Sequence, residues 1–295
     1  MNKPAKRLLF LILSLLFSLL FLTGCANREE VPVSVSVVEP APAPIIETSE
    51  PVNNEPDPTP IETMEQVPPP ATSDSWYFQR NNQHQVPYVD ETIKVRLNAN
   101  NSLYYLESPD NKIYLTFDEG YELGYTGQIL DTLKANDAKA IFFITGHYLN
   151  SQPDLVIRMK QEGHLVGNHT VNHPDMGIAE ARIIESEIKD LEEKYTILTG
   201  IPMDKYLRPP MGLYSDASLA ATANLGYTTV FWSMAFNDWD PNKQPGAEYS
   251  YQHVMDNIHP GAVILLHAVS ESNTIALDKI IKDLKAAGYT FSLFS

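Results

Sequence analysis

The stretch Ile113-Tyr114-Leu115-Thr116-Phe117-Asp118-Glu119-Gly120 begins as an apolar strand and ends on two carboxylates and a glycine. After a helical pattern over residues 127–135 comes a second apolar stretch, Ala140-Ile141-Phe142-Phe143-Ile144. Strands that lack polar alternation are buried on both faces, as in parallel sheets covered by helices. The two stretches predict the start of an alternating β/α fold.

The alternation continues to the end of the chain. The longest helical pattern, residues 178–195, places Ile184, Ile188 and Leu191 on one face, with charged residues opposite. Repeated β–α units imply parallel strands with helices outside, in either a barrel or an open sheet. Further strands are expected at 164–167, 205–208, 227–231, 262–266 and 290–293, and further helices at 153–162, 215–225 and 273–287.

Polar residues follow five of the predicted strands, and this favours the barrel. In a β/α barrel such positions all lie on the C-terminal face, where the loops form the active site. An open sheet would gather them mainly at one crevice. The residues are Asp118-Glu119, Asn168-His169, Arg208, Asp238 and His267.

Two of these positions suggest a metal and a base. His169 and His173 are four residues apart, a spacing that one metal ion can bridge if the segment turns helically, although such a pair is often structural. Asp118 and Glu119 can converge only where the strand ends and the chain bends, and Gly120 supplies that freedom. A carboxylate beside a metal site is a natural general base, and the alternative is a solvated acidic turn.

Three other positions suggest further catalytic groups. In Arg208-Pro209-Pro210-Met211-Gly212, two prolines restrict the chain after an arginine that can pair with a base or bind an anionic substrate. Asp238-Trp239 combines a carboxylate with an apolar platform that suits a sugar face or orients a histidine, or it is an ordinary turn. His267 ends the most apolar strand and is a candidate acid.

Length and composition limit the class of protein. With 295 residues, 43% of them hydrophobic, the chain can form one large domain plus appendages. A single cysteine excludes a disulfide framework and a cysteine-based zinc ribbon. A net charge of −16 argues against nucleic-acid binding, because phosphate contacts need Lys and Arg.

The N-terminus predicts export. Basic residues precede an apolar run over residues 8–22, which has the form of a secretory signal and is short for a spanning helix. The run ends in Leu22-Thr23-Gly24-Cys25, which resembles the bacterial lipobox and predicts lipidation of Cys25 after removal of residues 1–24. The alternative is an uncleaved anchor. Either way we expect an extracytoplasmic, membrane-attached protein.

Between the signal and the folded part lies a predicted tether, residues 25–75. It holds 11 of the chain's 22 prolines and shows no apolar periodicity, so we expect a semi-extended, disordered linker. Residues 76–111 are expected to be an N-terminal extension packed on the barrel, as an added strand pair or a substrate-binding flap. The catalytic domain is expected at 112–295.

The five polar segments, in this order, resemble the polysaccharide deacetylase family (the NodB homology domain, carbohydrate esterase family 4). The stretches T-F-D-E-G-Y-E-L-G-Y-T, G-N-H-T-V-N-H-P, R-P-P-M-G, F-W-S-M-A-F-N-D-W-D and L-L-H-A-V-S are similar to the delta-lactam-biosynthetic de-N-acetylases. Those enzymes deacetylate N-acetylmuramic acid in peptidoglycan during spore-cortex maturation. The resemblance implies a distorted (β/α) barrel with fewer than eight complete repeats, which acts on peptidoglycan without its stem peptides and leads to muramic δ-lactam.

The resemblance also implies roles for particular residues. Asp118 is the expected general base and His267 the general acid, while Arg208 orients Asp118 or holds substrate. Asp238 tunes His267, and the Met211 amide contributes to an oxyanion hole. The remaining expected groups are the metal ligands His169, His173 and Glu119, for a divalent ion such as zinc, cobalt or manganese, and the substrate contacts Arg208, Trp239 and Tyr121.

One position departs from the family pattern. Most of the family has a second aspartate, the third metal ligand, where this chain has Glu119. Its longer side chain either reaches the metal or turns away and leaves a weaker site of two histidines. Two alternatives therefore stay open beside the muramic acid reading: a deacetylase of N-acetylglucosamine and a non-catalytic glycan-binding lipoprotein. We expect a monomer.

Overall fold

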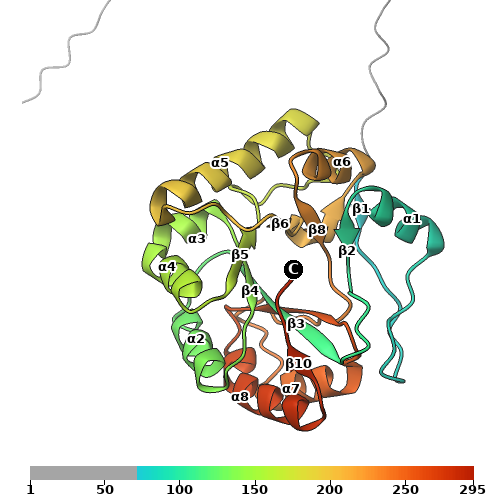
Figure 1. The fold of residues 1–295 in the computed structure, drawn as a ribbon, viewed down its shortest axis with the longest axis vertical. Coiled ribbons are helices and arrows are strands. Elements are labelled where there is room, and N and C mark those ends of the chain that lie inside the picture. The colour runs from blue at the N-terminus through green and yellow to red at the C-terminus, as the bar shows by residue number, and fades with distance from the viewer. Residues whose placement is uncertain (1–71) are drawn as a thin grey trace, which may run out of the picture. The chain divides into compact units, whose positions relative to one another are not determined.

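The computed structural model describes residues 72–295, and its central feature is a curled parallel sheet surrounded by helices (Figure 1). The predicted signal, Cys25 and nearly all of the predicted tether lie outside the described residues. Six strands lie side by side and parallel, in the order β9, β3, β4, β5, β6, β8. These strands are β3 (Lys112–Glu119), β4 (Ile141–Ile144), β5 (Leu165–Asn168), β6 (Tyr206–Leu207), β8 (Thr228–Val230) and β9 (Val263–His267).

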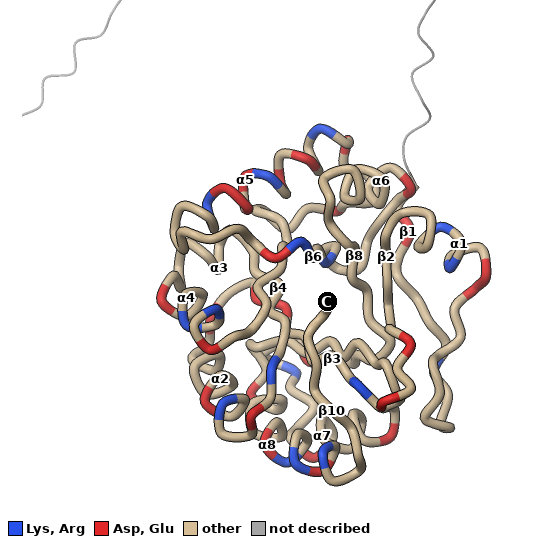
Figure 2. The backbone as a smooth tube through the Cα atoms, in the orientation of Figure 1, with Lys and Arg blue, Asp and Glu red and all other residues tan. Residues whose placement is uncertain are grey.

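Helices follow each of these strands, which confirms the predicted distorted (β/α) barrel with fewer than eight repeats. All four residues of β4 are buried, as are the last seven of β3, because helices cover one face and the barrel interior the other. Charged residues of both signs lie mostly on the outer helices (Figure 2). The helices are α2 (Thr126–Ala135), α3 (Gly146–Ser151), α4 (Pro153–Gln161), α5 (Ala181–Thr199), α6 (Asp216–Asn224), α7 (Ala247–Asn257) and α8 (Glu271–Ala286).

The structure corrects the start of one predicted helix and adds two helices. Helix α5 begins at Ala181 and not at residue 178, because Asp175 Oδ1 accepts the backbone N–H of Gly177 in a turn that precedes the helix. Helices α3 and α7 were not predicted. Six-residue α3 is too short to show a periodic pattern, and it depends on a cap in which the Thr145 side chain accepts the N–H of Tyr148.

The N-terminal segment is part of the barrel wall. It contains α1 (Glu91–Ala99) and β2 (Ser102–Leu103), and β2 pairs in parallel with β8 while Tyr105 forms a bridge with Ala262 beside β9. This segment therefore fills the gap between β8 and β9. The predicted tether also ends earlier than residue 75, because β1 (Asp74–Ser75) pairs antiparallel with β7 (Leu213–Tyr214).

The C-terminus closes the end of the barrel at which the strands begin. Strand β10 (Thr290–Phe291) pairs with the start of β3, and the chain end lies at the middle of the ring of strands in Figure 1. Phe294 is buried and stacks on Tyr114 at 5.2 Å, near the first residues of β4, β5 and β6. With that end filled, the opposite rim is the accessible one.

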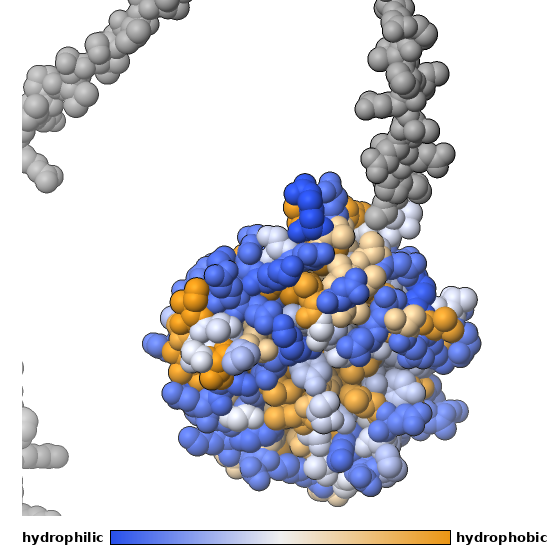
Figure 3. Space-filling view, turned by 45° about the horizontal axis from the view of Figure 1, so that its top comes forward, coloured by the Kyte–Doolittle hydropathy of each residue, from blue (hydrophilic) through white to orange (hydrophobic). Residues whose placement is uncertain are grey.

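The surface is mainly hydrophilic, with separate apolar patches in the face shown in Figure 3. Among residues 72–295, no helix is both long and apolar enough to span a bilayer.

Candidate active site

Asp118 and Arg208 form a buried ion pair at the C-terminal rim. Arg208 Nη1 donates to Asp118 Oδ1 at 2.8 Å, and the guanidinium also packs over the Phe143 ring at 4.3 Å. Burial alone would raise the pKa of Asp118, but the charge and hydrogen bond of Arg208, together with the charge of His267, outweigh it, so the pKa lies below its ordinary value. Asp118 is therefore an ionised carboxylate with one oxygen, Oδ2, turned away from the arginine.

The burial of Arg208 bears on its predicted substrate contact. The side chain is 0% exposed, so its charge does not reach solvent where an anionic glycan would approach. Of the two predicted roles, the structure places Arg208 where it orients Asp118, and it does not present the guanidinium as a surface contact.

Glu119 faces away from Asp118. Strand β3 continues through Glu119 without a bend, so adjacent side chains keep opposite directions. The Glu119 carboxylate is fully buried behind the strand, where Thr126 Oγ1 donates to its Oε2 at 3.4 Å. The Thr126 hydroxyl, with its single hydrogen, contacts both Glu119 and Glu122, and Glu122 also accepts hydrogen bonds from the Thr126 backbone N–H at 3.2 Å and from the Tyr148 hydroxyl. Burial and the neighbouring Glu122 raise the pKa of Glu119 well above its ordinary value.

His169 and His173 lie together at the end of β5, with ring centroids 4.9 Å apart and rings nearly perpendicular. His169 Nδ1 is 2.8 Å from the carbonyl oxygen of Arg208, and because a carbonyl only accepts, Nδ1 carries the proton. Burial lowers the pKa of His169 to about 4 and also lowers that of His173, so both rings are neutral at pH 7. Neutral imidazoles are the form that binds metal ions.

The donor set fits a metal ion held by two histidines but not the predicted three-ligand set. His169 Nε2 keeps its lone pair and faces Asp118 Oδ2 across 3.6 Å, so two acceptors meet where a cation or a donor hydrogen would stabilise them. Glu119 is not part of this group. Within residues 72–295, no three His, Cys, Asp or Glu side chains gather closely enough to hold a metal ion. The prediction that Glu119 is the third metal ligand is therefore wrong, because its side chain points to the face of β3 opposite Asp118.

His267 and Asp238 form the second charged pair. His267 Nδ1 is 2.7 Å from Asp238 Oδ1, and the His267 backbone N–H donates to Asp238 Oδ2 at 2.9 Å. Burial lowers the pKa of His267, but the charge and hydrogen bond of Asp238 outweigh it, so the pKa is raised above 6.5. His267 lies in register with Asp118 on the neighbouring strand, and residues in register share a face of the sheet.

The three remaining predicted residues are exposed around the rim. Met211 lies in a short 3₁₀ turn (Pro210–Gly212) and has left-handed backbone angles, φ 57° and ψ 4°, which are unusual for a residue with a side chain. Its side chain is 57% exposed, as is that of Trp239, and Tyr121 is 43% exposed. Their side chains are therefore available to a ligand.

Sequence reasoning missed two groups that support these pairs. Asn273, near the start of α8, donates from Nδ2 to Asp238 Oδ2 at 2.5 Å and so satisfies the second carboxylate oxygen. Gln244 donates to the Asp238 backbone carbonyl at 2.9 Å. Neither residue follows a strand, and no local pattern connects them with Asp238.

The arrangement can perform a hydrolysis that needs a base and an acid. Asp118 is ionised and can accept a proton, whereas the raised pKa of His267 lets it donate one. The two groups occupy neighbouring strands and are each oriented by an oppositely charged partner.

Known proteins are similar to this chain in sequence and in fold. A profile of the family described as polysaccharide deacetylase matches residues 106–230. The chain is 44% identical over 217 residues to the peptidoglycan-N-acetylmuramic acid deacetylase PdaA of Bacillus subtilis, which covers 74% of this chain and 82% of that protein. The solved structure of PdaA, a family 4 carbohydrate esterase, superimposes with a TM-score of 0.72 over 75% of this chain and 94% of that one. A peptidoglycan-N-acetylglucosamine deacetylase of Bacillus cereus is 36% identical over 194 residues, 64% of this chain and 69% of that protein.

Proposed function

The chain belongs to the polysaccharide deacetylase family, and from this membership we propose that it removes the acetyl group from N-acetylmuramic acid in peptidoglycan. The observation that carries the proposal is the pairing of Asp118 with His267 in register, one ionised and the other with a raised pKa. The similarity to PdaA over most of both chains supports muramic acid as the sugar.

The reaction is hydrolysis of the acetamide. Asp118 takes a proton from a water molecule as the water oxygen attacks the acetyl carbonyl carbon, while Arg208 holds the carboxylate in place. The backbone N–H of Met211 donates to the resulting oxyanion, a contact of a kind worth about 3 kcal/mol. His267, held by Asp238, protonates the nitrogen as the C–N bond breaks. Acetate and a free amine leave.

His169 and His173 would hold a divalent ion such as zinc, cobalt or manganese in this site. When bound, it would polarise the acetyl carbonyl and lower the pKa of the attacking water. The fit rests on two neutral imidazoles, one of them with its tautomer fixed by the Arg208 carbonyl.

The proposal extends to the final product of the reaction and to the place in the cell where the protein acts. On muramic acid without a stem peptide, the freed amine lies next to the lactyl carboxyl group, and loss of water between them gives the δ-lactam found in spore cortex. The predicted lipid on Cys25 would keep the enzyme on the outer face of the cell membrane, with the tether allowing it to reach the wall.

A second candidate is a deacetylase of N-acetylglucosamine in peptidoglycan, which the similarity to the Bacillus cereus enzyme favours. The two candidates differ in which sugar loses its acetyl group, because muramic acid alone carries the lactyl group needed for the lactam.

The test is to incubate the full-length chain, with added zinc, cobalt or manganese, with intact peptidoglycan and with peptidoglycan stripped of stem peptides. Mass spectrometry of a muramidase digest then identifies each deacetylated sugar, with Asp118→Asn as the inactive control. Deacetylated or lactam-containing muramic acid in the stripped sample alone is the expected result. Loss of acetyl from glucosamine supports the second candidate, and no change in either sample supports a glycan-binding role without catalysis.

A further inference from the structure

The first described residues contact a loop that follows the two histidines. Ser73 Oγ donates to Asp175 Oδ1 at 3.1 Å. Gly177 lies so close that a Cβ atom there would stand 2.0 Å from Ser73 Oγ. This close packing connects the start of the folded chain with the segment directly after His173.

The same residues contact the turn that contains Met211. Strand β1 pairs with β7 directly after the turn, and the backbone N–H of Trp76 donates to the Gly212 carbonyl at 2.8 Å. Gly212 has φ +69°, and a Cβ atom there would stand 2.8 Å from the Trp232 ring and 3.2 Å from Trp76 Cβ. Met211 and Gly212 are thus two consecutive left-handed residues, and the second of them packs against Trp76 and Trp232.

The Trp76 side chain is firmly anchored. Its Nε1–H donates to the Trp232 carbonyl at 2.9 Å, and its ring stacks on Phe231 with centroids 4.6 Å apart. Tyr104 packs at 5.2 Å, and Trp76 is only 7% exposed. A left-handed conformation at a residue such as Met211 persists only where its surroundings impose it. Trp76 provides such surroundings on one side of the turn.

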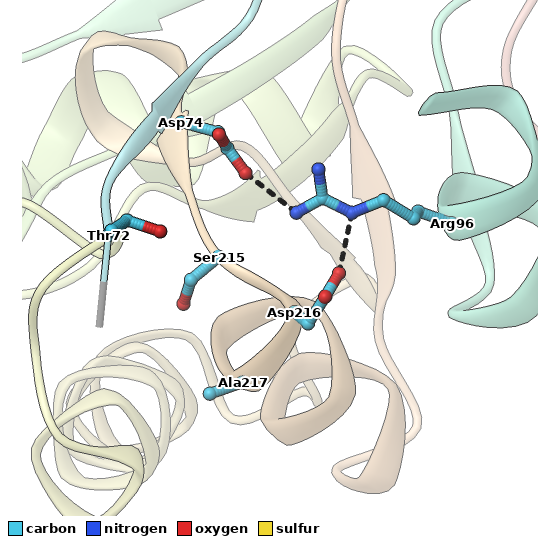
Figure 4. A pocket seen from close by; sticks show the side chains of 6 residues that line it. All are labelled: Thr72, Asp74, Arg96, Ser215, Asp216 and Ala217. Carbon is cyan, nitrogen blue, oxygen red and sulfur yellow. Dashed lines mark hydrogen bonds and ion pairs between the residues drawn. The ribbon is translucent and has the colours of Figure 1, made fainter. Parts of the chain in front are cut away.

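Ion pairs of Arg96 also hold residues 73–76 in place, but they contribute less than the packing of Trp76 does. Arg96 of α1 bonds Asp74 at 2.7 Å and Asp216 of α6 at 2.6 Å, beside an open pocket of about 450 Å³ (Figure 4). The carboxylates of this pair are 42% and 75% exposed, and exposed pairs contribute little. Trp76 is therefore the main attachment.

We propose that Ser73–Trp76, which we call the strap, positions two active-site loops, and that Trp76 is the positioning residue that keeps the Met211 turn in its left-handed conformation. The strap includes the last three residues of the predicted tether (25–75), so the segment expected to lead to the membrane also contacts two active-site loops. The proposal rests on the proposed function in that the Met211 amide is expected to contact the reacting oxygen.

The test compares four variants of the full-length chain in deacetylation kinetics and in amide hydrogen exchange of the Met211–Tyr214 segment. Trp76→Ala removes the ring and the indole donor, and Trp76→Phe keeps a ring but removes the donor. Tyr77→Ala changes a neighbour that is 71% exposed. Leu97→Ala opens a cavity in the same apolar cluster.

We expect Trp76→Ala to lower kcat by about tenfold or more with little change in KM, because a displaced oxyanion donor weakens the transition state more than substrate binding. Exchange at the turn should accelerate. Trp76→Phe should show a smaller effect in the same direction, and Tyr77→Ala none. Leu97→Ala should lower thermal stability while it keeps kcat at temperatures where the protein is folded.

Three results overturn the proposal: unchanged kcat and unchanged exchange in Trp76→Ala, a kcat loss of equal size in Leu97→Ala, or turn exchange that accelerates equally in both. If the wild-type chain deacetylates neither glycan, the proposed function fails, and exchange at the turn still decides whether Trp76 holds it. If Trp76→Ala does not fold, Trp76→Phe tests the proposal in its place, because it should show a smaller change in the same direction.

Discussion

The two faces of strand β3 place neighbouring carboxylates in environments that shift their pKa values in opposite directions. On the barrel side, Asp118 meets Arg208, His169 and His267, and its pKa is lowered. On the helix side, Glu119 meets Glu122, Thr126 and no cation among its described hydrogen-bond and ion-pair partners, and its pKa is raised. One step along the chain therefore separates a charged group suited to catalysis from a buried group that favours its neutral form.

This difference shows that the order of residues in a motif does not assign their roles. The family pattern places a metal ligand after the base, yet the alternation of β3 directs Glu119 toward Thr126 of α2. There its Oε2 accepts one hydrogen bond from Thr126, and its Oε1 has no hydrogen-bond partner among the described residues. Variants of Asp118 and Glu119 should therefore differ in their effects on activity, on metal binding and on stability.

The largest effect is expected from Asp118→Asn. Loss of the base should lower kcat by about 10³-fold, within the range for general base catalysis, while Asn keeps an oxygen for Arg208. Glu119→Gln is the matched control and should stay within about tenfold of wild type, as no step depends on Glu119. Deacetylation of stripped peptidoglycan measures both. Equal losses in the two variants would contradict the division between the two faces of β3.

Metal binding should follow the histidines and not Glu119. His169→Gln and His173→Gln should each weaken zinc or cobalt binding by about 100-fold or more, because loss of a ligand exceeds loss of an outer partner. Glu119→Gln should bind as wild type does. Titration calorimetry after chelator treatment measures the affinities, and chelator should also abolish activity until metal is returned. Loss of metal binding in Glu119→Gln would show that Glu119 is a metal ligand.

The pH dependence of the reaction rate should reflect the protonation of His267. Because its pKa is raised, the protonated acid persists above pH 6.5, and the rate should fall as pH rises through this raised value. Asp238→Asn removes the charge that raises the pKa, so the alkaline limb should move to lower pH and kcat at pH 7 should fall by about tenfold.

A kcat/KM profile of both proteins measures the shift. An alkaline limb that stays in place in Asp238→Asn would show that another group titrates there.

The smallest effect concerns stability at Glu119. Its pKa is higher in the folded chain than in the unfolded one, so folding binds a proton and stability falls as pH rises above the unfolded value of about 4.3. Glu119→Gln removes this loss, and its Tm at pH 7 should exceed that of wild type by about 2–4 °C. Thermal melts at pH 7 and pH 4 test this. A Tm difference that does not shrink at pH 4 would contradict the protonation argument.

Local pattern was sufficient for the main strands and most of the helices, but not for α3 and α7 or for all of the site. The apolar strands and the polar residues after them predicted the barrel and brought Asp118, Arg208, Asp238 and His267 to one rim. The direction of Glu119 was left open, because it depended on whether the chain bends before or after that residue. The boundary of the tether was placed too late, since a strand of two residues has no periodicity to detect.

The sequence by itself determined the order of the main strands and of the helices other than α3 and α7, and the set of polar residues at the strand ends, because alternation and spacing are local properties. Only the tertiary structure decided which of those residues face each other and what supports them. Trp76 reaches Trp232 across 156 residues, and Arg208 reaches Asp118 across 90. Such contacts form because the sheet curls and joins distant segments, and no neighbouring residue along the chain carries that information.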